Sequence, residues 1–276
     1  MYDPVKYKQD AIDNWNRVAS DYHNEWAGAG RGPFQSTKEL VAAADLEKGN
    51  IVLDLACGTG AASTQAAARI GPSGTLVGID FSRGALAIAK SGIPSGHFAE
   101  MDAESIGLAM KLDRVICQYA LMFFPDPVRV LGQVEALLKN GGRLAAAVHG
   151  TAKGVPYFST IMEPVRKHIP DIRPDGTPTV HRFGEPADLE RLLVSAGFED
   201  IEIKKFVFGY DAGGFDEYWS DYMSTTAASI RSKIEAKGKQ IVAAIRKESR
   251  EKAELYAQNG RIYFPWDVLV VTARKL

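Results

Sequence analysis

The stretch VLDLACGTG, residues 52–60, decides the fold class of this chain. Residues 51–56 form a continuous apolar run that is interrupted only by Asp54, as expected of a strand buried on both faces. Gly58 and Gly60 follow, and then an alanine-rich segment that favours a helix. A buried strand therefore leads through a glycine loop into a helix, and the exposed amides of such a helix start suit a bound ligand.

The alternation of strand and helix continues on both sides of this loop. A capping box at residues 36–39 predicts a helix before the first strand, and Ser82 and Pro127 mark the starts of two later helices. Apolar runs predict four further strands, at residues 75–80, 97–102, 113–120 and 143–149. Strands that alternate with helices indicate βαβ units, and hence a parallel sheet.

The second half of the chain is less regular. Residues 150–184 hold five of the 13 prolines and predict a long connection with one helix. A helix at 186–198 and an alternating strand from 199 follow, then two or more helices within 214–258, and the chain closes with an apolar strand. Residues 1–35 predict two short helices and a loop. This half therefore departs from simple βα repetition.

The composition excludes several protein classes. The 276 residues are 46% hydrophobic and 24% charged, as in an ordinary globular protein. The formal net charge of -1 does not favour a nucleic-acid partner, and a basic helix at 231–250 is expected to be a solvated face. No apolar run approaches the ~20 residues of a membrane span, and the start of the chain lacks a signal-peptide core. Two cysteines exclude a disulfide framework, and the histidine spacing does not predict a metal site. We expect a cytoplasmic monomer or homodimer.

A second carboxylate narrows the ligand of the glycine loop. Asp80 ends the next strand about twenty residues later, where a carboxylate can accept hydrogen bonds from ribose hydroxyls. A dinucleotide site would carry a third glycine where this chain has Ser63. Asp54 would also repel a pyrophosphate, whereas it would favour a cationic group. A ribose joined to a positively charged amino acid fits better, which points to S-adenosylmethionine.

Five motifs in chain order carry a resemblance to a known family: VLDLACGTG, VGIDFS, EMDAE, VICQYALMFFPDP and LLKNGGRLAAAV. The chain resembles class I S-adenosylmethionine-dependent methyltransferases, in the small-molecule group that includes the ubiquinone and menaquinone enzymes. The resemblance implies an α/β, Rossmann-like, seven-stranded and mostly parallel sheet with its last strand antiparallel and helices on both faces. It also implies in-line methyl transfer from S-adenosyl-L-methionine to a small molecule, with S-adenosyl-L-homocysteine as product.

The resemblance implies roles for individual residues at the strand ends. The glycine loop after the first strand would hold the methionine end of the cofactor. The end of the second strand would bind the ribose, and the end of the third strand would bind the adenine. The end of the fourth strand would lie near the methyl group. The residues concerned are Asp54, Ala56, Gly58, Thr59, Gly60, Asp80, Phe81, Asp102, Ala103 and Gln118. Plainer roles stay open for some of them: Asp80 and Asp102 as helix caps, Phe81 as core and Gln118 as a polar strand end.

Aromatic and basic residues outside the βα units are the candidates for binding the acceptor. Aromatic side chains suit a planar or apolar molecule, although the same residues could form the core between cap and sheet. The predicted substrate residues are Trp26, His181, Arg182, Tyr210, Tyr218, Trp219 and Tyr222. His149 is the predicted general base, and Tyr22 the second predicted catalytic residue.

The predicted domain division follows from these motifs. Residues 1–35 form an N-terminal lid, and residues 36–276 form one methyltransferase domain with a helical substrate cap at 212–258. Residues 118–121 replace the motif of enzymes that methylate nucleic-acid bases, and the quinone-enzyme motif near the N-terminus is absent. The acceptor therefore stays open. The alternatives are an NAD-dependent oxidoreductase and a noncatalytic module that binds S-adenosylmethionine.

Overall fold

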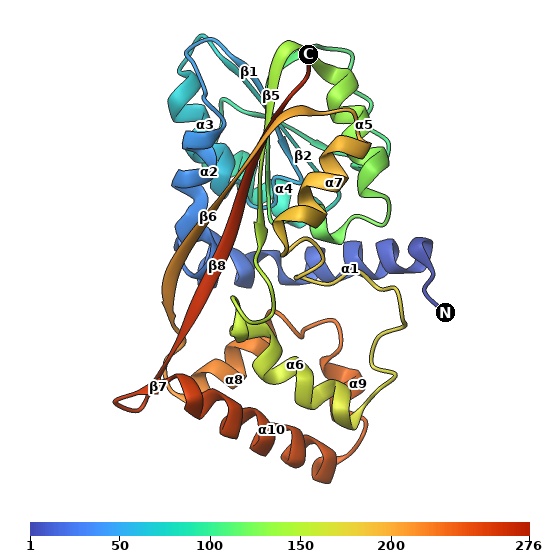
Figure 1. Cartoon of the computed structure of the whole chain (residues 1–276), viewed down its shortest axis with the longest axis vertical. Helices are drawn as coiled ribbons and strands as arrows, with labels where there is room; N and C mark the ends of the chain where they lie inside the picture. The colour runs from blue at the N-terminus through green and yellow to red at the C-terminus, as the bar shows by residue number, and fades with distance from the viewer.

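A twisted sheet occupies the upper part of the molecule in the computed structural model, which describes residues 1–276 (Figure 1). Seven strands follow the order β3-β2-β1-β4-β5-β8-β6. Their bounds are β1 (Ile51–Leu55), β2 (Thr75–Asp80), β3 (His97–Glu100), β4 (Leu112–Gln118), β5 (Leu138–His149), β6 (Glu199–Asp211) and β8 (Arg261–Arg274). The two-residue strand β7 (Ala257–Gln258) pairs only with β8.

The pairing confirms the predicted α/β architecture. Strands β1 to β5 pair in parallel, and β8, the last strand, lies antiparallel to both of its neighbours β5 and β6. Strand β1 lies inside the sheet between β2 and β4, and its residues Val52, Leu53 and Leu55 are fully buried. Helices cover both faces of the sheet (Figure 1). Those of the βα part are α2 (Thr37–Ala43), α3 (Ala61–Ile70), α4 (Arg83–Gly92), α5 (Pro127–Leu137) and α7 (Pro186–Ser195).

The starts of α4 and α2 test two of the predicted helix caps. Ser82 caps α4 as predicted, because its hydroxyl accepts the amide proton of Ala85 at 3.2 Å. The predicted capping box before α2 is wrong in detail. A 3₁₀ turn, Gly32–Ser36, runs directly into α2, and the Ser36 hydroxyl bonds the Pro33 carbonyl at 2.8 Å instead of capping the helix.

The N-terminal segment is one long helix, α1 (Pro4–Tyr22), followed by a π-helical turn, His23–Ala27. The prediction of two short helices is therefore wrong. Asp3 caps α1 by accepting the amide protons of Val5 and Lys6, and no glycine or proline interrupts the helix beyond its first residue. In Figure 1, α1 crosses the molecule between the sheet and the helices below it.

The lower part of the molecule is helical. Strands β6 and β8 form a long ribbon that descends past the other strands to this part (Figure 1). The connection after β5 contributes one helix, as predicted, and the segment before β8 contributes three. These are α6 (Pro156–His168), α8 (Phe215–Ser224), α9 (Arg231–Glu235) and α10 (Lys239–Ala253). No helix is long and apolar enough to cross a membrane.

Candidate active site

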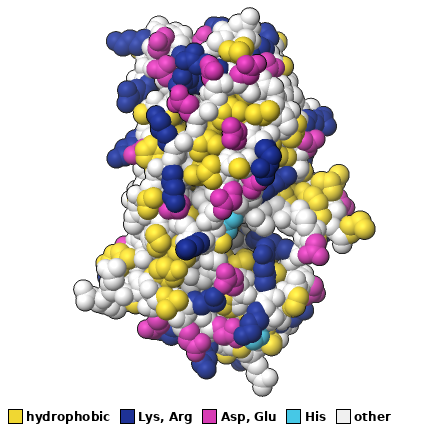
Figure 2. All heavy atoms as spheres, viewed as in Figure 1, with side chains coloured by type: hydrophobic (Ala, Val, Ile, Leu, Met, Phe, Trp, Pro, Cys, Tyr) yellow, Lys and Arg dark blue, Asp and Glu magenta, His cyan; other side chains and the backbone are white.

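A cavity of about 1150 Å³ lies at the carboxyl ends of the parallel strands. It is lined by α1, by the loops that follow β1 to β5, by α6 and by the segment between α8 and α9. Figure 2 shows the surface indented where the sheet meets the lower helices. The strand order reverses its direction beside β1, and ligands of open α/β sheets bind at such a point.

The glycine loop after β1 opens toward this cavity. Gly58 has a φ of 53°, and a Cβ there would meet no heavy atom within 4 Å. Gly60, with a φ of 90°, behaves differently: it does not line the cavity, and a Cβ there would lie 3.2 Å from the Ala89 Cβ. Gly58 therefore permits close approach of a ligand, whereas Gly60 permits close packing of α3 against α4.

Asp80 ends β2 and organises the loops on either side. Its carboxylate accepts the amide protons of Gly58 at 2.9 Å and of Ser82 at 2.8 Å. Burial raises the pKa of this carboxyl, against the lowering effect of those amides. The cap of α4 is Ser82, so Asp80 is not a helix cap. Each carboxylate oxygen keeps a further lone pair, which suits the two hydroxyls of a ribose.

Asp54 is almost completely buried beneath the glycine loop. Its carboxylate accepts a 2.5 Å hydrogen bond from Ser63, the residue at the third glycine position of a dinucleotide site. Burial, helped by the charge of Asp80, raises the pKa of Asp54 to about 7. A nearby ammonium group would restore the ionised form, whereas a pyrophosphate would not. The residues at this end of the cavity therefore fit S-adenosylmethionine.

Helix α1 is bonded to the loops that follow β2 and β3. Lys8 Nζ lies 2.7 Å from Asp102 and 2.6 Å from Glu104, both after β3. Asn16 Oδ1 accepts the Ser82 hydroxyl proton at 3.1 Å, after β2. Lys8 and Asn16 are not among the predicted residues, because no local sequence pattern relates them to partners 66 to 96 residues away.

The π-helical turn continues this contact to the glycine loop. His23 Nδ1 lies 3.0 Å from the Thr59 hydroxyl, after β1. Asp102 stays half-exposed beside Lys8, and Phe81 and Ala103 line the same part of the cavity. The predicted cofactor residues are thus brought together at one end, with Gly60 as the exception.

The end of β4 carries a strained residue that the sequence did not reveal. Gln118 lines the cavity, as predicted, and its amide donates to the Thr37 hydroxyl at 3.0 Å. The next residue, Tyr119, has a φ of 56°, which is unusual for a bulky side chain. Its hydroxyl donates to the Pro33 carbonyl at 2.8 Å, and its ring stacks on His149 with centroids 4.4 Å apart.

The surroundings of His149 disfavour the predicted base role. Trp266 Nε1 donates a 3.2 Å hydrogen bond to His149 Nδ1, so the neutral ring carries its proton on Nε2. Burial lowers the pKa of His149 to about 3. His149 therefore lines the cavity as a neutral hydrogen-bond donor, an arrangement that does not favour the predicted role of general base.

His181 has the opposite hydrogen bonding. Its Nδ1 lies 2.8 Å from the Gly150 carbonyl, so Nδ1 carries the proton and Nε2 is the bare acceptor. Nε2 is buried without a hydrogen-bond partner, and the residue lines the cavity. The predicted substrate residue His181, unlike His149, therefore has a free basic nitrogen.

Aromatic side chains line the acceptor end, but four predicted substrate residues do not: Arg182, Tyr210, Tyr218 and Trp219. The Arg182 guanidinium donates to the Phe124 carbonyl at 2.7 Å, and the Tyr218 hydroxyl donates to the Tyr157 carbonyl at 2.5 Å.

The other two also have partners elsewhere. Tyr210 is stacked behind Trp26, and Trp219 lies beneath the Arg246 guanidinium. Tyr210 and Tyr218 join the lower helices to the β6–β8 ribbon, whereas Trp219 packs against α10 and Arg182 binds the loop after β4. None of these four predicted substrate residues lines the cavity. Tyr22, Trp26 and Tyr222 do line the cavity.

Basic side chains border the acceptor end. Three basic side chains line the cavity and make no ion pair with the protein: Arg173, Arg166 of α6, and Lys233 of α9. The neighbouring Glu163 is instead neutralised by Lys252 at 2.6 Å. The two ends of the cavity therefore differ in charge, with carboxylates at the strand ends and cations beneath α1.

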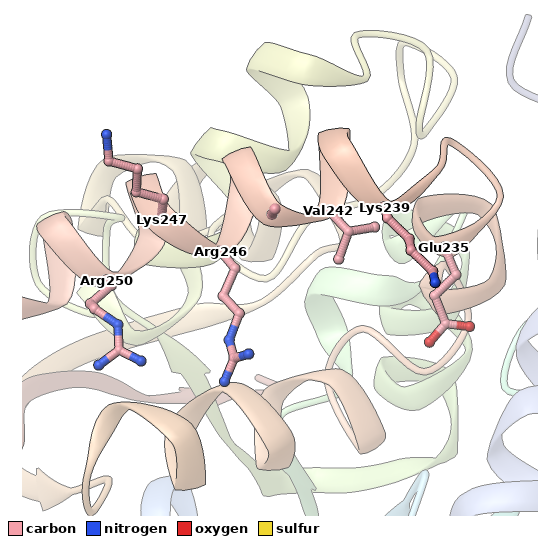
Figure 3. Close-up of a pocket in the computed structure, with 7 residues that line it drawn as sticks. Glu235, Lys239, Val242, Arg246, Lys247 and Arg250 are labelled. Carbon is pink, nitrogen blue, oxygen red and sulfur yellow. The ribbon is translucent and has the colours of Figure 1, made fainter.

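A second hollow lies on α10 and is lined by seven residues (Figure 3). Arg246 and Arg250 point to the same side, where both bind Asp216 of α8 at 2.9 and 2.8 Å, while Lys247 points away. The basic helix predicted as a solvated face is thus partly neutralised by its neighbour. This hollow is lined only by residues of α9 and α10, whereas the strand-end cavity brings together polar groups from the ends of several strands.

Comparison with known proteins agrees with this geometry. A family model described as a methyltransferase domain matches residues 46–173. Aklanonic acid methyltransferase DauC of Streptomyces sp. (strain C5) is 31% identical over 178 residues, which cover 58% of this chain and 80% of that protein. The chain belongs to the class I S-adenosylmethionine-dependent methyltransferases. Demethylmenaquinone methyltransferase of Bacillus cytotoxicus is 26% identical over 230 residues, covering 77% of this methyltransferase and 92% of that one.

Solved structures match the fold of the methyltransferase. The YcgJ protein of Bacillus subtilis superimposes with a TM-score of 0.59 at 19% identity, over 87% of this chain and 98% of that one. Phosphoethanolamine N-methyltransferase 2 of Haemonchus contortus, solved with S-adenosylhomocysteine, gives 0.58 at 14% identity, over 94% and 57%. The oxidoreductase and noncatalytic alternatives are not favoured, because the relatives are named as methyltransferases.

Proposed function

We propose that this methyltransferase acts on a small planar molecule that carries an anionic group. The observation that carries the proposal is the division of one cavity into two chemically different ends. Carboxylates and a glycine loop form the first end, and aromatic rings with unpaired arginines form the second.

At the first end, the residues fit the cofactor group by group. Asp54 would face its ammonium group, Asp80 the ribose hydroxyls, and Asp102 with the Ala103 amide the adenine. When bound, S-adenosylmethionine supplies a methyl group on a positively charged sulfur. The protein aligns the acceptor with that methyl group and excludes water, and the buried, weakly polar wall at Cys57 and Tyr119 supports this.

At the second end, the walls suit a flat acceptor. Phe158 and Tyr222 face the cavity beside His149 and His181, and aromatic walls favour stacking with planar molecules. Arg166 and Arg173 would hold an anionic group at the rim. The names of the relatives, aklanonic acid and demethylmenaquinone methyltransferase, accord with an acid and with a quinone ring.

The N-terminal segment, residues 1–35, acts in this proposal as a lid over the cofactor. Its contacts reach the loops after β1, β2 and β3, so the cofactor cannot enter past α1 without some of them opening. The segment 212–258 serves as part of the acceptor cap, since Tyr222, Thr225 and Ile230 line the cavity.

Replacing Lys8 by methionine is expected to loosen this lid. The bridge to Asp102 and Glu104 is partly shielded from solvent, so its loss should cost about 1 kcal/mol and speed release of S-adenosylhomocysteine roughly 5-fold. Stopped-flow displacement measures this rate. Lys6→Met is the matched control, because Lys6 pairs only with Asp10 along the same helix. Equal release rates in wild type and Lys8→Met would contradict the lid.

Two measurements test the proposed function. S-adenosylhomocysteine at ~100 times its dissociation constant should stabilise the fold by about 2.7 kcal/mol, and NAD should not. Transfer of a radiolabelled methyl group to 1-hydroxy-2-naphthoic acid should exceed transfer to its carboxamide, which lacks the anion. Stabilisation by NAD alone would overturn the cofactor assignment, and equal transfer to acid and amide would overturn the anionic acceptor.

A further inference from the structure

The buried Nε2 of His181 is an acceptor that no group of the protein satisfies. Buried polar atoms almost always have a partner, and an exception on a residue that lines a cavity points to a ligand. Because Nε2 carries no proton, the matching ligand group is a donor such as a hydroxyl. The unpartnered Nε2 atom of His181 therefore bears on which group of the proposed acceptor is methylated.

The fold holds the His181 ring in one orientation. Its Nδ1–H donates to the Gly150 carbonyl at 2.8 Å, directly after β5. Gly184 packs so closely on the same residue that a Cβ there would lie 2.6 Å from the Gly150 carbonyl carbon. The edge of Phe158 packs against the ring with centroids 5.7 Å apart. A base with its second nitrogen fixed by a hydrogen bond has the arrangement that general-base catalysis requires.

His149 complements this arrangement. It offers a proton from Nε2, because Trp266 occupies its Nδ1, and it lies close enough to His181 for the charge of His181 to lower the pKa of His149. The cavity thus presents one fixed acceptor and one fixed donor. A hydroxyl oxygen can donate to the first and accept from the second.

We propose that the methylated group of the acceptor is a hydroxyl and that His181 Nε2 removes its proton. The proposal rests on the proposed function. As the O–H bond breaks, the proton passes to Nε2, the oxygen forms a bond to the methyl carbon, and the methyl–sulfur bond leaves its electron pair on sulfur. The products are a methyl ether, S-adenosylhomocysteine and an imidazolium at His181.

The electrostatic surroundings return His181 to its basic form. Burial and the charge of Arg166 on α6 lower the pKa of His181, against the raising effect of the Gly150 carbonyl directly after β5. His149, the other titratable group acting on this side, stays neutral. The imidazolium therefore passes its proton to water at neutral pH, ready for another turnover.

The test compares His181→Asn with wild type on two acceptors. Asparagine can keep the bond to Gly150 but lacks the basic nitrogen. The first acceptor, 2-naphthol with an anionic sulfonate at carbon 6, keeps its hydroxyl proton at neutral pH, whereas the hydroxyl of the second, 2-hydroxy-1,4-naphthoquinone, is already ionised. We expect kcat to fall about 10²- to 10⁴-fold for the naphthol and less than 5-fold for the ionised acceptor. His168→Gln is the histidine control, since His168 binds Glu248 outside the cavity.

Further readouts separate a base from a merely structural residue. S-adenosylhomocysteine affinity should be unchanged in His181→Asn, and the rate for the naphthol should rise with pH as its hydroxyl ionises. Equal losses for both acceptors, or no loss for the naphthol, would overturn the base role. If wild type binds S-adenosylhomocysteine but methylates neither acceptor nor the naphthoic acid, the proposed acceptor class fails and this inference fails with it.

Discussion

Asp80→Ala should weaken the binding of S-adenosylhomocysteine about 10- to 100-fold. The carboxylate lies at the carboxyl end of β2 and accepts the amide protons of Gly58 and Ser82, so it shapes the glycine loop in addition to the ribose contact proposed for it. Hydrogen bonds to a charged group contribute about 1.5–3 kcal/mol, which corresponds to this range of affinity. Isothermal titration calorimetry measures the dissociation constant.

The neighbouring strand supplies the control for Asp80. Glu100 is paired with Asp80 in the β2–β3 register, but its carboxylate binds Arg83 at the surface and does not line the cavity. Glu100→Gln should therefore bind S-adenosylhomocysteine as wild type does. Asp80→Asn, which keeps one carbonyl acceptor, should lie between the two. Unchanged affinity in Asp80→Ala would remove the ribose role.

The proposed cofactor end of the cavity was predictable because a short sequence motif marks each of the strand ends that form it. An aspartate lies at or within two residues of the carboxyl end of each of β1, β2 and β3, and parallel strands bring those ends to one edge of the sheet. Asp54, Asp80 and Asp102 therefore lie together, as motif spacing alone indicated. Only Gly60 differs, because a positive φ is needed both where a ligand approaches and where two helices pack.

The acceptor end was less predictable because its residues meet through long-range packing. Tyr218 and Tyr222 are one helical turn apart on α8, yet Tyr218 is enclosed by Tyr157 and Phe264 while Tyr222 reaches the cavity. The roles of His149 and His181 depend on which nitrogen each neighbour occupies, Trp266 in one case and Gly150 in the other. No periodicity in the sequence encodes that choice.

Trp266→Ala should destabilise the protein by about 3–5 kcal/mol. The indole is fully buried where the β6–β8 ribbon meets the lower helices, with ring centroids 5.2 Å from Tyr157 and 5.3 Å from Phe158. Truncation leaves a cavity among these rings and should lower the melting temperature by roughly 10 °C. Thermal unfolding followed by circular dichroism measures the change. Tyr263→Ala, on the same strand but 36% exposed, should cost about 1 kcal/mol or less.

Trp266→Phe separates the indole hydrogen bond from its packing. Phenylalanine fills much of the volume but cannot donate to His149 Nδ1, so the imidazole proton is free to move between the two nitrogens. We expect a smaller loss of about 1–3 kcal/mol, together with a higher KM for the acceptor, because His149 no longer presents a fixed donor to the cavity. Nitrogen-15 NMR of the imidazole reports the tautomer. A single Nε2–H tautomer in both wild type and Trp266→Phe would show that the indole does not control His149, and the assignment of a fixed donor beside a fixed acceptor would then lose its structural cause.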